Sequence, residues 1–236
     1  MVVDQRNQEE SKSIILNFKF QNFFNTMARD TEAKCRKCRR AGEKLFLKGD
    51  RCSTGNCGMV KRAYAPGVHG KKVSRGQSEY GTQLSAKQKI KRIYGVMERQ
   101  FRKHFDEVSN KEGITGDLLL TRLEMRLDSI VYRAGFAVSR AQARQIVNHG
   151  LISVNGKKMT IPSAEVKIGD MIAINATKKE KNYFKEVVAV IKNKKDFPSW
   201  ISFDTTKMEA KVTSAPTRDE IGINVDTQII VEYYSR

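Results

Sequence analysis

The sequence predicts an α+β fold, with helices in the first half of the chain and a small antiparallel sheet in the second. Apolar residues recur at three- and four-residue steps over 85–105 and again over 117–134, which is the period of an amphipathic helix. Asn155-Gly156 lies between two short alternating segments, a strong signal for a β-hairpin. Four cysteines in two close pairs precede the helices and predict a small folded knuckle. We therefore expect an N-terminal knuckle and helical domain, followed by a small domain of two helices packed on an antiparallel sheet with a basic hairpin.

The positive charge is concentrated in one part of the chain. The 236 residues contain 44 Lys and Arg against 26 Asp and Glu, a formal net charge of +18. Residues 27–116 contribute net +13 (22 basic, 9 acidic), 117–180 net +4 (10 and 6), and 181–236 net +1 (9 and 8), whereas 1–26 are neutral. A concentrated basic block is typical of a phosphate-binding surface; a merely solvated basic surface is the alternative.

The same shifts in composition divide the chain into four segments. Residues 1–26 lack charge bias, capping signals and clear periodicity, and predict a loosely ordered extension. We expect the knuckle and basic helical domain in 27–116 and the small helix-and-hairpin domain in 117–180. Residues 181–236 are expected to complete the sheet and to pack back on the helical domain.

Composition also excludes several classes of protein. Apolar residues make up 39% of the chain, enough to fill a core, so the chain is not disordered throughout. The most apolar N-terminal run, residues 14–24, is interrupted by polar side chains and falls short of the roughly 20 apolar residues that span a bilayer. It is also a poor secretory signal. We expect a cytoplasmic protein, and in that compartment cysteines are more often metal ligands than disulfide partners.

The cysteines have the spacing of a metal site. Cys35 and Cys38 form a C-x2-C pair, and Cys52 and Cys57 form a C-x4-C pair thirteen residues later. Four thiolates so spaced can surround one ion tetrahedrally, an arrangement that suits Zn2+. An iron–sulfur cluster uses the same four thiolates and is the alternative, followed by free or redox-active thiols. A closed four-cysteine site leaves no open position for a catalytic water, so we predict a structural zinc.

Capping signals set the expected helix boundaries. Ser85 and Ser139 each open a Ser-x-x-Gln segment of capping-box form. Asp117 is placed to cap a helix that stops before Gly135. The predicted helices are 85–105, 117–134 and 139–149, and the predicted strands are 151–154, 157–160 and 171–174.

Basic and aromatic side chains in these segments are the candidate nucleic-acid contacts. Arg140, Arg144 and Asn148 stand at four-residue steps and should share one outward helix face, and Lys157 lies at the hairpin tip. The full set is Arg36, Arg39, Arg40, His69, Lys71, Lys72, Arg75, Tyr80, Lys87, Lys91, Arg92, Arg102, Arg140, Arg144 and Lys157.

Two segments of the predicted small domain resemble a known module. Ser-Arg-Ala-Gln-Ala-Arg-Gln at 139–145, followed by Val-Asn-Gly-Lys at 154–157, resembles the RNA-binding domain first described in bacterial ribosomal protein four of the small subunit. That domain is also attached to pseudouridine synthases and tyrosyl-tRNA synthetases. Further motifs resemble the ribosomal protein family itself over about residues 27–236. They are the four cysteines and the segments 66–70, 78–81, 87–89, 94–96, 100–102, 126–128, 198–200 and 230–236.

The resemblance implies a structural constituent of the small ribosomal subunit that binds small-subunit rRNA and nucleates assembly of the subunit body. It implies contact with small-subunit ribosomal protein five, a contribution to translational accuracy, and a position near the mRNA entry channel. It also implies that the four cysteines hold zinc, and that the protein resides on cytoplasmic ribosomes. Neither membrane association nor an obligate homo-oligomer is expected.

Enzymes are the main rivals to this interpretation. The triplet 126–128, Arg-Leu-Asp, resembles the catalytic loop of pseudouridine synthases, but in those enzymes the small domain comes first and a long catalytic domain follows. Residues 67–72 lack the spacing of a phosphate loop, and three histidines without a paired acid and base predict no catalysis. The remaining alternatives are a non-ribosomal RNA-binding factor, an rRNA-modifying enzyme carrying the same small domain, and a DNA-binding regulator. The last would place one recognition helix in a major groove, whereas a basic hairpin beside a helix suits RNA shape.

Overall fold

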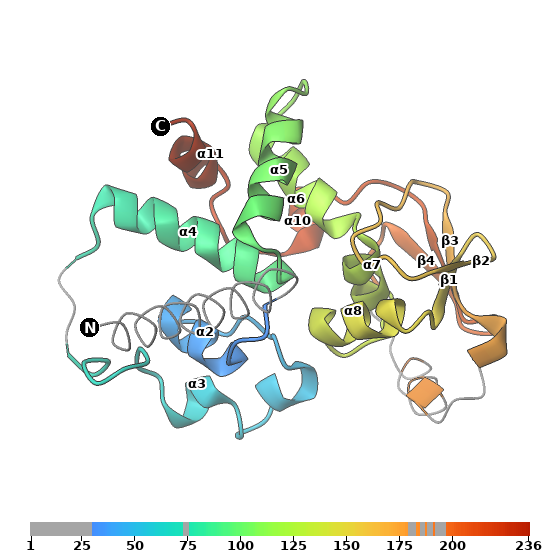
Figure 1. Ribbon diagram of the computed structural model, residues 1–236, viewed down its shortest axis with the longest axis horizontal. Coiled ribbons are helices and arrows are strands. Elements are labelled where there is room, and N and C mark those ends of the chain that lie inside the picture. Colours follow the sequence, from blue (N-terminus) through green and yellow to red (C-terminus); the bar gives the residue numbers. More distant parts are fainter. Residues whose placement is uncertain (1–29, 73–75, 179–182, 185–186, 188–190, 192–196) are drawn as a thin grey trace, which may run out of the picture.

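The computed structural model describes residues 30–72, 76–178, 183–184, 187, 191 and 197–236 (Figure 1). The predicted extension 1–26 and Arg75 lie outside the described residues. The helices are α2 (Lys34–Ala41), α3 (Gly58–Lys61), α4 (Glu79–Tyr94), α5 (Glu98–Ser109), α6 (Thr115–Glu124), α7 (Leu127–Arg133), α8 (Arg140–Asn148), α10 (Arg218–Ile221) and α11 (Gln228–Tyr234), with 3-10 turns η1 (Gly49–Cys52) and η2 (Ala176–Lys178). The strands are β1 (Ile152–Val154), β2 (Lys157–Met159), β3 (Met171–Ile174), β4 (Ile201–Asp204) and β5 (Glu209–Val212).

The sheet is antiparallel throughout its described pairs, in the order β2-β1-β3-β5-β4. The predicted hairpin is confirmed: Val154 pairs with Lys157, and Asn155 and Gly156 both have positive φ, at 50° and 76°. Two consecutive left-handed residues fit the turn type that joins twisted strands tightly. The α+β class predicted from the sequence is therefore confirmed.

Two hydrophobic cores hold the described chain together. One packs α7 and α8 against the sheet and contains the fully buried Trp200. The other joins α4, α5 and α6 to the C-terminal helices α10 and α11. Figure 1 shows the sheet at one end of the molecule, α4 and α11 at the other, and α7 and α8 between them. The domain boundaries at 26/27, 116/117 and 180/181 remain predictions.

The first predicted long helix begins and breaks at other places than expected. Its N-cap is Ser78, whose hydroxyl accepts a hydrogen bond from the Gly81 amide at 3.2 Å, so the prediction of a start at Ser85 was wrong. Gly95, with φ of 65°, ends α4, and α5 begins at Glu98. The apolar stripe nevertheless stays in one core, because both helices turn it inward.

The predicted helix 117–134 is two helices, because tertiary hydrogen bonds interrupt it. The Leu127 amide donates to the Ala164 carbonyl at 2.9 Å and the Asp128 amide to the Pro162 carbonyl at 3.0 Å. These bonds replace the helical ones between α6 and α7, in a stretch where the propensity alone favours helix. By contrast α8 begins as predicted, with the Ser139 hydroxyl accepting from the Gln142 amide at 3.3 Å. The Gln142 side chain returns to the Val138 amide instead of that of Ser139, so only half of the predicted capping box forms.

None of the helices that the structure describes is long and apolar enough to cross a bilayer.

Candidate nucleic-acid interface

The four cysteines lie together at α2, η1 and the start of α3. Cys35, Cys38, Cys52 and Cys57 all line one small cavity of about 10 Å³, and all but Cys35 are buried. Burial and the neighbouring thiols raise the pKa of Cys38. In the residues that the structure describes, no three His, Cys, Asp or Glu side chains are closed around a common ion position. The chemistry of the donor set, four cysteines lining one cavity, nevertheless fits a thiolate-bound ion.

Many of the predicted contacts are exposed on the surface. Around the cysteines Arg36 and Arg40 project into solvent, while Arg39 is half-buried and donates to the Tyr64 carbonyl at 2.9 Å. The other exposed members of the predicted set are His69, Lys71, Lys72, Tyr80, Arg102 and Lys157. These side chains are available to a phosphate backbone.

Lys87 has a different environment from the one expected. It is buried, its ammonium lies 2.7 Å from the Glu98 carboxylate, and it sits 4.3 Å from the centre of the Tyr233 ring. Lys91 contacts the other Glu98 oxygen at 3.0 Å. The geometry therefore gives Lys87 a packing role between α4, α5 and α11. The apolar stripe of α4 could not reveal this, because it does not show which acid lies opposite.

A fully buried carboxylate organises the joint between the two cores. Glu124 accepts from the Tyr94 hydroxyl at 2.8 Å, from Nη2 of Arg133 at 2.7 Å and from Nη2 of Arg140 at 2.8 Å. Burial alone would raise the pKa of Glu124, but Arg140 and Arg133 outweigh it and hold the pKa below its ordinary value. Burial, followed by the Glu124 charge, raises the pKa of Tyr94 well above its ordinary value.

A second buried carboxylate lies close by. Asp128 receives two bonds from Arg126, at 2.8 and 3.1 Å, and one from Arg144 at 3.4 Å. Arg126 and Asp128 form a buried pair at the break between α6 and α7. His104 accepts from Nε of Arg122 at 3.1 Å and lies 3.4 Å from Arg126.

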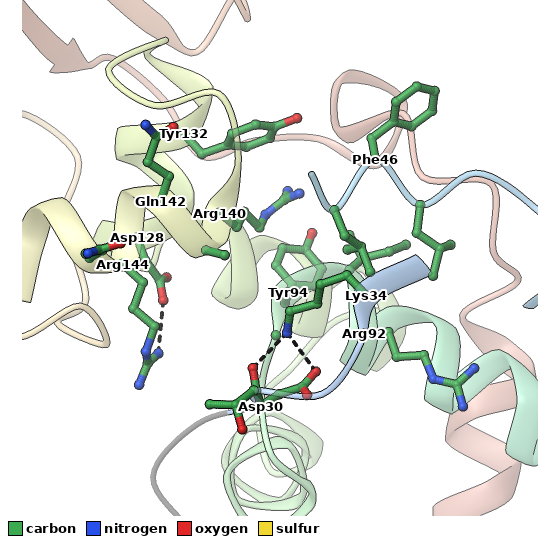
Figure 2. Close-up of a pocket in the computed structure, with 17 residues that line it drawn as sticks. Asp30, Lys34, Phe46, Arg92, Tyr94, Asp128, Tyr132, Arg140, Gln142 and Arg144 are labelled. Atoms are coloured by element: carbon green, nitrogen blue, oxygen red, sulfur yellow. Dashed lines mark hydrogen bonds and ion pairs between the residues drawn. The ribbon is translucent and has the colours of Figure 1, made fainter. Parts of the chain in front are cut away.

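A cleft of about 370 Å³ opens beside these networks (Figure 2). It is lined by α2, the segment 45–47, the end of α4, and helices α7 and α8. Lys34, Arg92, Arg140 and Arg144 bring four cations to it. Three of them face carboxylates, Lys34 with Asp30 at 3.1 Å and the two α8 arginines as above.

Sequence reasoning missed Glu124, Arg133 and Phe46. Glu124 had a detectable signal, because it stands four residues after Leu120 on the apolar face of its helix. A charge on such a face needs buried partners. Phe46 had no such signal, since its exposure depends on the backbone of a turn.

The basic hairpin and the exposed cations, carried on two packed cores, are features of the nucleic-acid-binding class of proteins. Residues 29–124 match the family described as ribosomal protein S4/S9 N-terminal domain, and residues 125–172 match the S4 domain family. The chain belongs to the ribosomal protein S4 family.

Several relatives are similar over nearly the whole chain. The small ribosomal subunit protein uS4 of Syntrophomonas wolfei subsp. wolfei is 50% identical over 210 residues, which are 89% of this chain and 100% of the relative. That of Clostridioides difficile is 49% identical over 213 residues, with the same coverage of both chains. That of Solidesulfovibrio magneticus is 46% identical over 210 residues, again 89% and 100%.

Proposed function

We propose that this chain is a structural constituent of the small ribosomal subunit that binds small-subunit rRNA. The observation that carries the proposal is the match of residues 29–172 to the two S4 family models, together with the exposed cations that the structure places on the knuckle, the 67–72 loop and the hairpin. The family identification also supports a structural protein rather than an enzyme.

The protein binds RNA through phosphate contacts made by cations that a rigid scaffold holds in place. Exposed cations such as Arg36, Lys71 and Lys157 supply affinity through the phosphate backbone, and the shape of the folded surface supplies specificity. The buried carboxylates Glu124 and Asp128 fix the arginines of the joint, so part of the surface is organised before RNA arrives. Preorganisation lowers the entropy that binding costs.

The four cysteines are proposed to hold a structural zinc ion. Their convergence on one cavity supports this, as does the sulfur donor set. The ion would fix the knuckle that carries Arg36 and Arg40. Metal analysis of the purified chain should find one zinc per chain; finding none, with four titratable thiols in the folded state, would reject the site.

Finer features of the function rest on the family resemblance. They are contact with small-subunit ribosomal protein five, a position near the mRNA entry channel, early assembly of the subunit body, an effect on translational accuracy, and a cytoplasmic location on the ribosome. The motifs over residues 66–102 and 230–236 support them, because they extend the likeness beyond the small domain.

Footprinting on small-subunit rRNA tests the proposal. We expect specific protection, and an affinity that falls about 10³–10⁵-fold between roughly 50 and 200 mM salt if some 6–10 phosphates are contacted. Lys157→Ala and Lys71→Ala should each reduce the salt slope by about one unit, whereas Lys207→Ala, at the β4–β5 turn, serves as the charge-matched control. Absence of specific protection would favour a non-ribosomal RNA-binding factor, and a salt-independent affinity would reject the electrostatic mechanism.

A further inference from the structure

We propose that the cleft between α2 and α8 receives one unstacked nucleotide of the bound RNA, with its base against Phe46 and its phosphate near Arg92. The inference rests on the proposed function and adds to it a specific recognition site. The volume of the cleft, about 370 Å³, lies within the range of about 300–1,000 Å³ that holds small ligands.

Phe46 combines an exposed aromatic ring with a positive-φ backbone. Its side chain is 51% exposed, and its backbone has a φ of 50°, a left-handed conformation that disfavours a bulky residue. Exposure and backbone strain in one residue are typical of sites that bind a ligand. The ring thus offers a free face on which a base can stack.

The cleft has an aromatic end and a charged end. Figure 2 shows Phe46 and Tyr132 at one end, and Lys34, Arg92 and Arg144 toward the other, where Asp30 and Asp128 pair with Lys34 and Arg144. A nucleotide is divided in the same way, because its flat base can stack on an aromatic ring and its phosphate carries the charge. Stacking on aromatic rings combined with cationic backbone contacts is how proteins hold single-stranded bases.

Arg92 is the cation that this arrangement leaves for the phosphate. Within the described part of the chain it makes no ion pair and no side-chain hydrogen bond, whereas Lys34 and Arg144 each face a carboxylate. It is half-buried, and burial followed by the charge of Arg40 lowers its pKa. Asp30 and Glu32 also act on the Arg92 charge, but neither is within ion-pair distance, so the guanidinium keeps its N–H donors for a phosphate.

The polar groups of α8 can read the base edge. Gln142 and Gln145 line the cleft from successive turns. Gln142 uses its carbonyl oxygen on the Val138 amide, which leaves its two N–H groups to donate. These donors suit an unpaired base whose Watson–Crick edge is open, as in RNA loops and bulges.

Photocross-linking tests the occupant directly. With p-benzoylphenylalanine in place of Phe46 in the full chain, bound to small-subunit rRNA, we expect one dominant cross-link to an unpaired nucleotide, mapped by reverse transcription. The same probe at Ile114, 68% exposed and outside the cleft, should give no such cross-link. A cross-link from position 46 to another protein, or to the chain's own N-terminal residues, would overturn the proposal.

Affinity measurements separate binding from folding. Phe46→Asn suits a left-handed backbone, so it should fold at least as stably as the parent while binding rRNA about 5- to 150-fold more weakly. Phe46→Tyr should bind like the parent, and Ile114→Ala serves as the control. If the parent binds and Phe46→Asn binds equally well, the cleft proposal fails and the proposed function stands. If the parent itself shows no specific rRNA binding, both fail.

Discussion

Replacing Glu124 by Gln should be among the most destabilising single changes at the joint between the two cores. The substitution keeps the shape and removes the charge. Glu124 is fully buried and accepts bonds from Tyr94, Arg133 and Arg140, all between 2.7 and 3.1 Å. A glutamine has one acceptor oxygen, and its NH₂ group would face guanidinium donors.

The magnitude follows from the burial of the partners. Breaking a buried ion pair by removing one member costs about 3–5 kcal/mol. Because the side chains of Arg133 and Arg140 keep 21% and 14% exposure, and Arg133 also donates to the Ile221 carbonyl at 2.8 Å, we expect the lower end, about 3 kcal/mol.

Urea unfolding followed by circular dichroism measures this loss. The matched control is Glu107→Gln, since Glu107 pairs with Arg122 but its side chain is 37% exposed, and we expect that change to cost less than about 1 kcal/mol. A loss below about 1 kcal/mol for Glu124→Gln would refute the view that this carboxylate holds the joint. The folded-state pKa of Glu124 is lowered, so its contribution is complete above the ordinary value of 4.5 and is lost as the pH falls through the lowered value. The difference between the parent and Glu124→Gln should therefore shrink as the pH falls below 4.5.

Three further predictions concern other parts of the chain. Burial, followed by the charges of Arg126 and Arg122, lowers the pKa of His104. The contribution of neutral His104 to stability is therefore complete above the ordinary pKa of 6.5 and should be lost as the pH falls below it. His104→Gln should flatten the slope of urea midpoints measured from pH 7 to 5, and identical slopes for the two proteins would contradict the prediction. Gly49 has a φ of 59°, and an added Cβ would lie 2.6 Å from the Val138 carbonyl oxygen, so Gly49→Ala should cost about 2 kcal/mol or more in thermal unfolding, whereas Gly55→Ala, with open space around it, should stay within about 0.5 kcal/mol. Chelation of zinc should unfold the knuckle and leave the ellipticity of the two cores largely intact, since structural zinc contributes roughly 10–16 kcal/mol to the folding of isolated zinc fingers. An unchanged hydrogen-exchange pattern over residues 34–61 after chelation would argue against a metal-dependent knuckle.

Local signals predicted the parts of the fold that local interactions decide. The hairpin follows from Asn155-Gly156, because their left-handed backbone sets the register of the two strands. The start of α8 follows from Ser139, whose hydroxyl reaches the third amide of the helix. Local signals therefore predicted the α+β class, the hairpin and the start of α8.

The errors arose where distant segments compete with local preference. Nothing near Leu127 indicates that its amide pairs with the Ala164 carbonyl, so the continuous apolar stripe predicts one helix where the structure has two. Ser78 and Ser85 are both plausible caps, and the choice between them depends on contacts such as Gln83 with Glu232, which are 149 residues apart. Those contacts exist only once α11 has docked on α4.

The arginines of α8 show why charge periodicity alone leaves a binding face undetermined. Arg140 and Arg144 share one face of α8, as predicted, but the prediction that this face points outward was wrong, because each arginine meets a buried carboxylate there. The acids stand four residues apart, at 124 and 128, as do the arginines, so the two pairs match in spacing across the joint. Each carboxylate also binds a second arginine, Arg133 or Arg126, which leaves the joint with more positive than negative charge. The same residues therefore lock the two cores together and keep a positive potential beside the cleft, where an RNA phosphate would meet it.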